Sequence, residues 1–177
     1  MPQNSKTLRI LGIDPGFGRM GFGMIEKLVS SLKLIDYGCV ETDTKKTFAE
    51  RLCGLAAELR QIIKKNQPDL VAVEELFFFK NLKTAINVAQ ARGAIILLAQ
   101  EAGAPIMELT PLQIKQSLSG YGRAEKQQVQ KMVQVILKLK EKPRPDDAAD
   151  ALAAAIAAAA YYRPLPIEGL RTKQDKD

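Results

Sequence analysis

Apolar and polar positions over residues 8–41 follow the short period of β-strands. Residues 8–14 form an apolar run, residues 19–26 alternate small and large side chains, and residues 33–41 form a third apolar stretch. Runs of this length, bounded by glycine and polar residues, are typical of strands that cover a core. The sequence therefore predicts three successive strands near the N-terminus.

The rest of the chain alternates between helical and strand patterns. Apolar residues recur at helical spacing over residues 47–66, and Asn66 and Pro68 predict where that helix ends. Further apolar patterns predict strand 70–74, helix 82–102, strand 105–109, a helix starting near residue 110, helix 124–140, and a last helix from Asp146 or Asp147 to about Tyr162.

Local signals support several of these boundaries. Thr110 can cap a helix, Pro111 suits the first helical position, and Gln113 completes a capping box. Pro143 and Pro145 are expected to end helix 124–140. Three strands followed by alternating helices and strands predict an α/β fold in one domain, residues 1–163. We expect residues 164–177 to form a disordered tail.

Composition limits the class of protein. The chain has 177 residues, of which 46% are hydrophobic and 26% charged, as in ordinary soluble domains. No apolar run reaches the roughly 18 residues of a membrane span, and the N-terminus lacks an apolar signal core, so we expect a cytoplasmic protein with no membrane partner. Cys39 and Cys53 are too few for a disulfide framework or a zinc site, and both are expected to be buried free thiols.

Histidine is absent, and the net charge is +6. Without histidine, a Ser-His-Asp triad, a Cys-His pair and an H-E-x-x-H zinc site are all excluded. Any acid–base or metal chemistry must then fall to carboxylates, lysine, tyrosine or cysteine. The positive charge favours a polyanionic partner.

The segment Gly16-Phe17-Gly18-Arg19-Met20-Gly21 matches the G-x-G-x-x-G pattern of dinucleotide-binding loops. Asp36 lies near the spacing of a ribose-binding acid, and residues 24–34 could also be helical by pattern. Against this hypothesis, Pro15 precedes the glycines and residues after them continue as a strand. We favour a strand, a tight glycine turn and a second strand. Asp14 then becomes the unusual residue, because a carboxylate at the end of a buried strand is costly unless it is paired or binds a metal.

Acidic residues also occur at the end of a second buried strand and at the start of the last helix. Glu74 and Glu75 follow the buried strand 70–74, and the last helix opens with three acids, Asp146, Asp147 and Asp150. The i, i+3 spacing of the last two places both on one helix face, and the alanines after them allow a close approach to a sheet. The acids of the helix could instead be caps or surface residues. We favour a shared carboxylate cluster.

A site made only of carboxylate oxygens suits Mg²⁺ or Mn²⁺. Two such ions about 4 Å apart can activate water and stabilise the leaving oxygen in phosphodiester cleavage. Residues 123–142 hold six basic and two acidic residues, a net charge of +4, which is either a solvated helix face or a phosphate contact that Lys115 could join. The triplet Phe77–Phe79 could place one ring against a base.

Five stretches together make the chain resemble the RuvC-type Holliday junction resolvases over about residues 8–161. They are LGIDPGFGRMGFG, AVEELFFFKN, NVAQARGAI, TPLQIKQSLSGYGRAEKQQVQ and DDAADALAAAI. The resemblance implies a ribonuclease-H-like fold with a mixed five-stranded sheet flanked by helices. It also implies a homodimer that makes paired symmetric nicks in four-way junctions, works with a branch-migration helicase complex of the RuvA-RuvB type, and leaves a 5′-phosphate and a 3′-hydroxyl.

The resemblance also implies roles for individual residues. The catalytic and metal-binding carboxylates would be Asp14, Glu74, Asp147 and Asp150, holding two Mg²⁺ ions for which Mn²⁺ can substitute. Some members of the family carry histidine at the position of Asp147. The residues implied to contact DNA are Phe77, Lys115 and Lys126.

Three other functions compete with this interpretation. A different nuclease of the same fold is disfavoured by the motifs around Phe77 and Lys126. An actin-like or sugar-kinase-like ATP-binding protein needs two similar domains, which 177 residues do not supply. A DNA-binding scaffold without activity is disfavoured because all four carboxylates are present.

Overall fold

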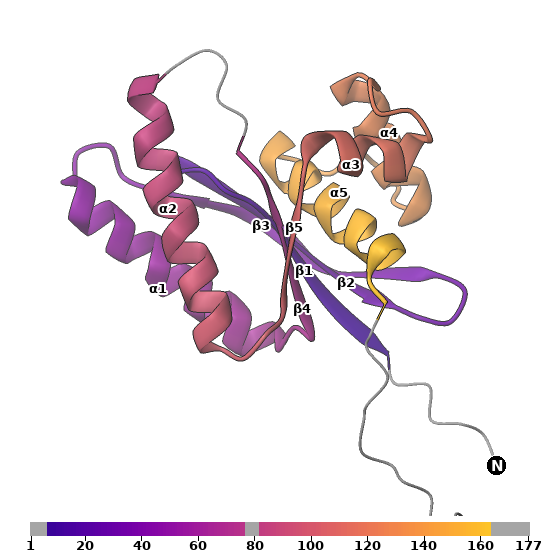
Figure 1. Ribbon diagram of the computed structural model, residues 1–177, viewed down its shortest axis with the longest axis horizontal. Helices are drawn as coiled ribbons and strands as arrows, with labels where there is room; N and C mark the ends of the chain where they lie inside the picture. Colours follow the sequence, from indigo (N-terminus) through magenta and orange to yellow (C-terminus); the bar gives the residue numbers. More distant parts are fainter. Residues whose placement is uncertain (1–6, 77–81, 164–177) are drawn as a thin grey trace, which may run out of the picture.

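The computed structural model describes residues 7–76 and 82–163. Its elements are β1 (Leu8–Asp14), β2 (Arg19–Lys27), β3 (Leu32–Glu41), α1 (Phe48–Asn66), β4 (Leu70–Glu74), α2 (Leu82–Glu101), β5 (Ile106–Leu109), α3 (Pro111–Ser119), α4 (Lys126–Ile136) and α5 (Asp146–Tyr161). The strands form one sheet in the order β3-β2-β1-β4-β5 (Figure 1). Strands β1, β2 and β3 pair antiparallel, whereas β4 pairs parallel with both β1 and β5.

Helices cover both faces of this sheet. On one face α1 and α2 pack against side chains such as Leu11, Val71 and Val73. On the other face lies α5, with α3 and α4 packed against it (Figure 1). Alternating side chains along each strand enter the two cores in turn, which explains why the central strands are apolar throughout.

The glycine segment is a turn between two strands. Gly16 and Gly18 lie between β1 and β2, which form an antiparallel hairpin, so no helix follows the glycines and the dinucleotide-binding hypothesis is wrong. Asp36, the residue that hypothesis required, forms an ion pair with Lys65 at 2.7 Å.

Helix α5 lies very close to the sheet because its inner face is alanine and the strands below it carry glycine. A Cβ atom on Gly12 would collide with the backbone of Ala151 and Ala155, and one on Gly21 would collide with the carbonyl of Asp147. Every residue from Ala148 to Ala159 except Asp150 is buried. The expected close approach of the alanine-rich helix to the sheet is therefore confirmed.

The capping box at Thr110 is confirmed. The Thr110 hydroxyl accepts from the Gln113 amide at 3.1 Å, and the Gln113 side chain accepts from the Thr110 amide at 2.8 Å. This motif starts α3 directly after β5, with Pro111 in the first turn. A second capping box, between Thr47 and Glu50, opens α1.

The expected helix 124–140 is shorter than predicted. Helix α4 ends at Ile136, Lys138 adopts a left-handed backbone with φ of 54°, and Pro143 and Pro145 lie beyond the helix end. Leu137 and Leu139 both pack against the core beside α5. A continued helix would point these two side chains in nearly opposite directions, so core packing ends the helix before the prolines do.

The prediction of buried thiols was wrong, although both cysteines are free. Cys53 is exposed on α1, and Cys39 on β3 is half-buried. No helix among the described residues is long and apolar enough to span a membrane. The expected tail, residues 164–177, lies outside the described residues.

Candidate active site

Two of the predicted carboxylates end neighbouring parallel strands. Ile13 of β1 lies beside Val73 of β4 in the sheet register, so Asp14 and Glu74 each follow at the same edge. Even-numbered residues of these strands, such as Ile10 and Ala72, face α5. By the same alternation Asp14 and Glu74 face that helix.

Helix α5 brings the other two carboxylates to this edge. Gly21 is the antiparallel partner of Asp14, and the backbone of Asp147 lies directly over Gly21. Asp150 follows one turn later on the same helix face. Asp14, Glu74, Asp147 and Asp150 therefore gather at one end of the sheet from three separate segments.

Two cations neutralise the acids of α5 in this structure. Arg19, the first residue of β2, contacts Asp147 at 3.2 Å and Glu41 at 3.0 Å. Lys126, the first residue of α4, contacts Asp150 at 2.8 Å and Asp146 at 3.5 Å. Asp146 therefore binds a cation beside the cluster. Arg19 could not be identified from the sequence, because the side chain that it reaches depends on how α5 packs over β2.

A cavity of 270 Å³ opens beside the carboxylates. Its polar wall consists of Glu74, Asp150, Lys115 and Lys126, and its apolar wall comes from α3, α4 and α5. Both predicted phosphate-binding lysines thus border the same space as two of the carboxylates.

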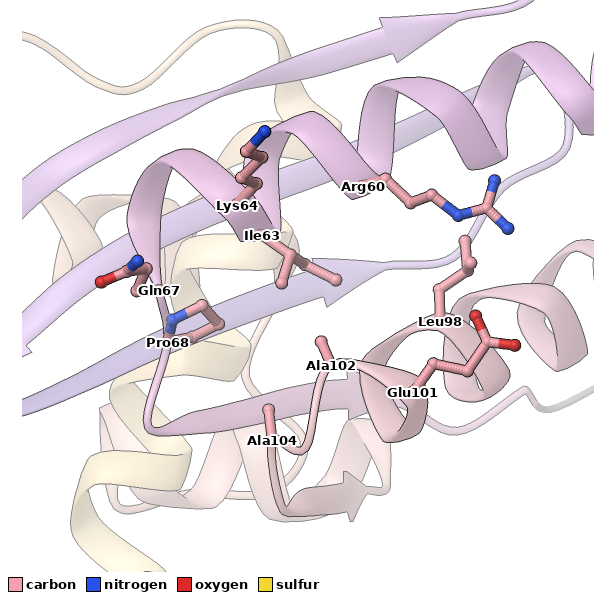
Figure 2. Close-up of a pocket in the computed structure, with 9 residues that line it drawn as sticks. All are labelled: Arg60, Ile63, Lys64, Gln67, Pro68, Leu98, Glu101, Ala102 and Ala104. Atoms are coloured by element: carbon pink, nitrogen blue, oxygen red, sulfur yellow. The ribbon is translucent and has the colours of Figure 1, made fainter.

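A larger cavity of 520 Å³ lies elsewhere (Figure 2). It is lined by the C-terminal turns of α1 and α2, at the end of the sheet where β4 and β5 begin. Glu101 is the one acid in its lining. It therefore lacks the paired carboxylates that distinguish the site at the other edge.

Burial and mutual repulsion perturb the carboxylates. Burial, and then the negative charges of Asp150 and Asp147, raise the pKa of Asp14 to about 7. Burial and the charges of Asp14 and Asp150 raise the pKa of Glu74 to about 7. Burial also raises the pKa of Asp150, although its ion pair with Lys126 opposes the shift. Three acids that disfavour their own ionised forms at one place are typical of a functional site.

This donor set fits a divalent metal ion by its chemistry. The available ligands are carboxylate oxygens, which Mg²⁺ prefers, and a cation between them would relieve the repulsion that raises their pKa values. As the side chains stand, no three acidic or cysteine residues in the described part of the chain converge closely enough to hold an ion. Asp147 and Asp150 are instead paired with Arg19 and Lys126.

The remaining predicted residues lie around this cluster or outside the described part. Glu75 lies away from the carboxylates, beside a cavity that it shares with Arg92 and Glu108. Phe77 lies outside the described residues.

Arg92 of α2 is a further residue that the sequence analysis did not single out. Its Nε donates to the backbone carbonyl of Glu74 at 3.2 Å, and its guanidinium also pairs with the Glu108 carboxylate of β5. Arg92 thereby ties the end of β4 to α2 and β5 from the face opposite α5. Its position in the motif NVAQARGAI was the signal available in the sequence.

Known proteins match this chain over most of its length. A profile of the family "Crossover junction endodeoxyribonuclease RuvC" matches residues 10–158. The RuvC protein of Caldicellulosiruptor saccharolyticus is 55% identical over 150 residues, 84% of this chain and 90% of that protein. That of Petrotoga mobilis is 51% identical over 146 residues, 82% of this chain and 90% of that protein.

Solved structures agree with these relatives. Thermus thermophilus RuvC superposes with a TM-score of 0.80 at 38% identity, covering 87% of this chain and 95% of that one. The same protein in complex with a Holliday junction substrate gives 0.79 at 36% identity, covering 87% and 94%. The expected ribonuclease-H-like fold, with its mixed five-stranded sheet and flanking helices, is therefore confirmed. The extent of the family match and the identity to its members show that this chain belongs to the RuvC family of crossover junction endodeoxyribonucleases.

Proposed function

We propose that the chain resolves Holliday junctions by metal-dependent hydrolysis of a phosphodiester bond in each of two opposing DNA strands. The observation that supports this most directly is the convergence of Asp14, Glu74, Asp147 and Asp150 beside a cavity with two lysines. The similarity to Thermus thermophilus RuvC, whose structure was solved in complex with a Holliday junction substrate, also supports it.

Nucleases of this family use divalent metal ions, and we propose two Mg²⁺ ions per site, with Mn²⁺ able to replace them. Asp14, Glu74, Asp147 and Asp150 would be the ligands. When bound, the ions would supply the Lewis acid that activates water and stabilises the leaving oxygen. The burial that raises the pKa values of Asp14 and Glu74 also strengthens their attraction to a divalent cation once it arrives.

The basic residues at the site would hold the DNA strand in place. Lys115 and Lys126 border the cavity next to Glu74 and Asp150, where each can contact a phosphate. Lys126 would exchange its carboxylate partners for phosphate oxygens as the acids turn to the metal. Phe77, three residues after Glu74 in the sequence, would contact a base. The products would carry a 5′-phosphate and a 3′-hydroxyl.

Paired cuts in two strands need two active sites, and we propose a homodimer formed through α2. Ile86 and Leu97, which lie on one side of this helix, are 64% and 58% exposed. Gly93 lies between them, and a Cβ there would meet nothing within 4 Å. A helix face with two large apolar side chains and a glycine allows a second copy to approach closely.

A branch-migration helicase of the RuvA-RuvB type is the proposed protein partner.

The decisive experiment is cleavage of a synthetic four-way junction with a mobile core, with linear duplex as the control, in Mg²⁺ with and without chelator. We expect symmetric paired nicks in Mg²⁺ that chelator abolishes. Asp14→Asn, Glu74→Gln and Asp150→Asn should each abolish cutting and retain junction binding, because they remove ligands and also reduce repulsion of DNA. Glu58→Gln, on the exposed face of α1, is the control and should cut normally.

Other outcomes would contradict the proposal. Cutting of linear duplex or RNA with no junction preference would support nuclease activity at this site and contradict the proposed junction specificity. Tight junction binding by the wild-type chain without cleavage would indicate a DNA-binding scaffold. Loss of binding together with cutting in all three variants would assign these carboxylates a structural role.

A further inference from the structure

A second cavity with basic residues in its lining lies near the active site. It is at the edge of the sheet that β3 forms. Its volume is 420 Å³, and we call it the β3 groove. The groove is lined by Leu34, Tyr37, Leu139, Lys140, Glu141, Lys142 and Arg144. The first two residues belong to β3, and the others belong to the segment that joins α4 to α5.

The early end of α4 creates this groove. Because the chain leaves the helix at Ile136 and packs Leu139 against the core, residues 138–144 cross toward β3. The lysines that would have continued a solvated helix face are placed beside a sheet edge instead. Leu34 and Leu139 form an apolar floor, and the charged side chains form the rim.

The cations of the groove are unpaired among the residues that the structure describes. Lys140, Lys142 and Arg144 are exposed, and in the described part of the chain none of their side chains forms a hydrogen bond or an ion pair. One acid, Glu141, faces three basic residues, a net charge of +2. By contrast, Arg19 and Lys126 at the carboxylates are both paired. Unpaired cations around a hollow are complementary to a polyanion.

The groove lies near the active site along the sheet and along the chain. Tyr37 pairs with Gly23 of β2, two residues along that strand from Gly21, the partner of Asp14. Two residues along a strand and two strands across correspond to a separation on the order of 12 Å. On the other wall, Arg144 lies two residues before Asp146, where α5 begins. A DNA strand that leaves the carboxylates toward β3 would therefore pass Arg19, which is paired with Asp147 and Glu41, and then reach the unpaired cations of the groove.

We propose that the β3 groove binds the phosphate backbone of the junction arm that runs from the active site toward the β3 edge of the sheet. Lys140, Lys142 and Arg144 contact phosphates, and the ring of Tyr37, which is 38% exposed, packs on a sugar or base beside them. This inference rests on the proposed function, because it assumes that the substrate is junction DNA. The contact in the β3 groove would hold the junction arm away from the cleaved bond, and it would take no part in the reaction.

The test compares two matched double variants. Lys142→Ala/Arg144→Ala removes one lysine and one arginine from the β3 groove, and Arg60→Ala/Lys64→Ala removes the same two charges from the cavity between the C-terminal turns of α1 and α2 (Figure 2). Junction affinity is measured over a range of salt concentrations in chelator, so that no cleavage occurs. One junction has long arms and the other has arms too short to extend past the active site.

We expect the groove variant to bind the long-armed junction about tenfold more weakly and to lower the salt slope by about two phosphate contacts. Its affinity for the short-armed junction and its cleavage rate at saturating protein should match wild type. The control variant should match wild type on both junctions. Hydroxyl-radical footprinting should show that the groove variant loses protection of phosphates on one arm.

Equal affinity and equal salt slope for the groove variant and wild type on long arms would overturn the inference. Equal weakening on short and long arms would overturn it too, because it would place the effect at the active site. Binding of an acidic peptide to the groove, with unchanged DNA affinity, would assign the groove to a protein partner. If wild type neither binds nor cuts junctions, the proposed function fails before this comparison is reached.

Tyr37 gives an independent check. Tyr37→Phe should retain the affinity for long arms, because the ring remains, and Tyr37→Ala should lose affinity several-fold. Equal affinities of the two variants would exclude a contact through the ring.

Discussion

At the scale of single residues, the site is a set of carboxylates held close together against their own charge. Asp14 and Glu74 have pKa values raised to about 7 because burial and neighbouring acids disfavour their ionised forms. Arg19 and Lys126 compensate part of the charge through Asp147 and Asp150. A divalent cation bound among these carboxylates would relieve the repulsion between them.

The raised pKa values predict how stability depends on pH. Asp14 and Glu74 have ordinary pKa values of 3.8 and 4.5, and in the folded protein both are raised to about 7. Between these values of pH, both groups bind more protons in the folded protein than in the unfolded chain. The free energy of unfolding should therefore fall as pH rises through this window, by up to about 1.4 kcal/mol per pH unit for each group. Urea unfolding in chelator at several pH values measures this slope.

Two comparisons check the cause. Asp14→Asn should flatten the slope and be more stable than wild type at pH 8 in chelator, and Mg²⁺ should stabilise wild type more than the variant. Glu58→Gln should keep the wild-type slope. A wild-type stability that rises between pH 5 and pH 7 would contradict the prediction.

Lys126 should contribute one phosphate contact. Lys126→Ala is expected to weaken junction binding and to lower the slope of log affinity against log salt by about one. Lys64→Ala, on α1 at the other edge of the sheet, is the control. A slope for Lys126→Ala that equals the wild-type slope would show that Lys126 stays paired with Asp150 when DNA is bound.

At the scale of secondary-structure elements, the position of α5 decides the geometry of the site. The alanines of α5 lie on Gly12 and Gly21 of the sheet, and this contact brings Asp147 and Asp150 to the strand ends. Arg92 ties the end of β4 to α2 and β5 from the other face. The backbone that carries the carboxylates is thus held in place by contacts with neighbouring elements.

Gly12→Ala should disturb this packing. A Cβ at Gly12 would collide with the backbone of α5, so the helix must shift. We expect a loss of stability of about 1–3 kcal/mol, as for other overpacked cores, and a loss of cleavage because Asp150 moves. Urea unfolding and junction cleavage measure the two effects.

Gly54→Ala is the matched control. Gly54 lies in α1, and a Cβ there would meet nothing within 4 Å. It should stabilise the protein by about 0.5–1 kcal/mol, because alanine favours helix, and leave cleavage unchanged. A Gly12→Ala variant as stable and active as wild type would show that α5 can adjust freely over the sheet.

At the scale of the whole molecule, the substrate requires more than one site. The carboxylates lie where β1 and β4 end, and the β3 groove lies near them. Helix α2, which carries the exposed Ile86 and Leu97, lies on the other side of the sheet from α5 (Figure 1). DNA and a second copy of the chain can therefore occupy different surfaces.

Leu97→Asp should separate the proposed dimer, because it places a charge on the apolar face of α2. Analytical ultracentrifugation should show a monomer, and cleavage should fall to single, unpaired nicks. Val29→Asp, at a residue 87% exposed in the turn between β2 and β3, should leave both properties unchanged. A Leu97→Asp variant that sediments as wild type would place the dimer contact elsewhere.

Much of this architecture was determined by local sequence patterns. The strand that ends at Asp14, the strand that ends at Glu74, the capping box at Thr110 and the acids that open α5 each depend on residues close in sequence. For that reason their positions could be predicted to within one or two residues, and the absence of histidine limited the chemistry to carboxylates, lysine, tyrosine or cysteine.

Other features were decided only by the tertiary structure. Arg19 reaches Asp147, 128 positions away in the chain, because strand register and helix packing place them together. Helix α4 ends at Ile136 because Leu137 and Leu139 must both reach the core, against a continuing helical pattern. The exposed Cys53 and the β3 groove follow likewise from which faces the core covers. Local patterns encode which conformation a segment prefers, whereas the partner of a charge and the burial of a side chain depend on segments far away in the sequence.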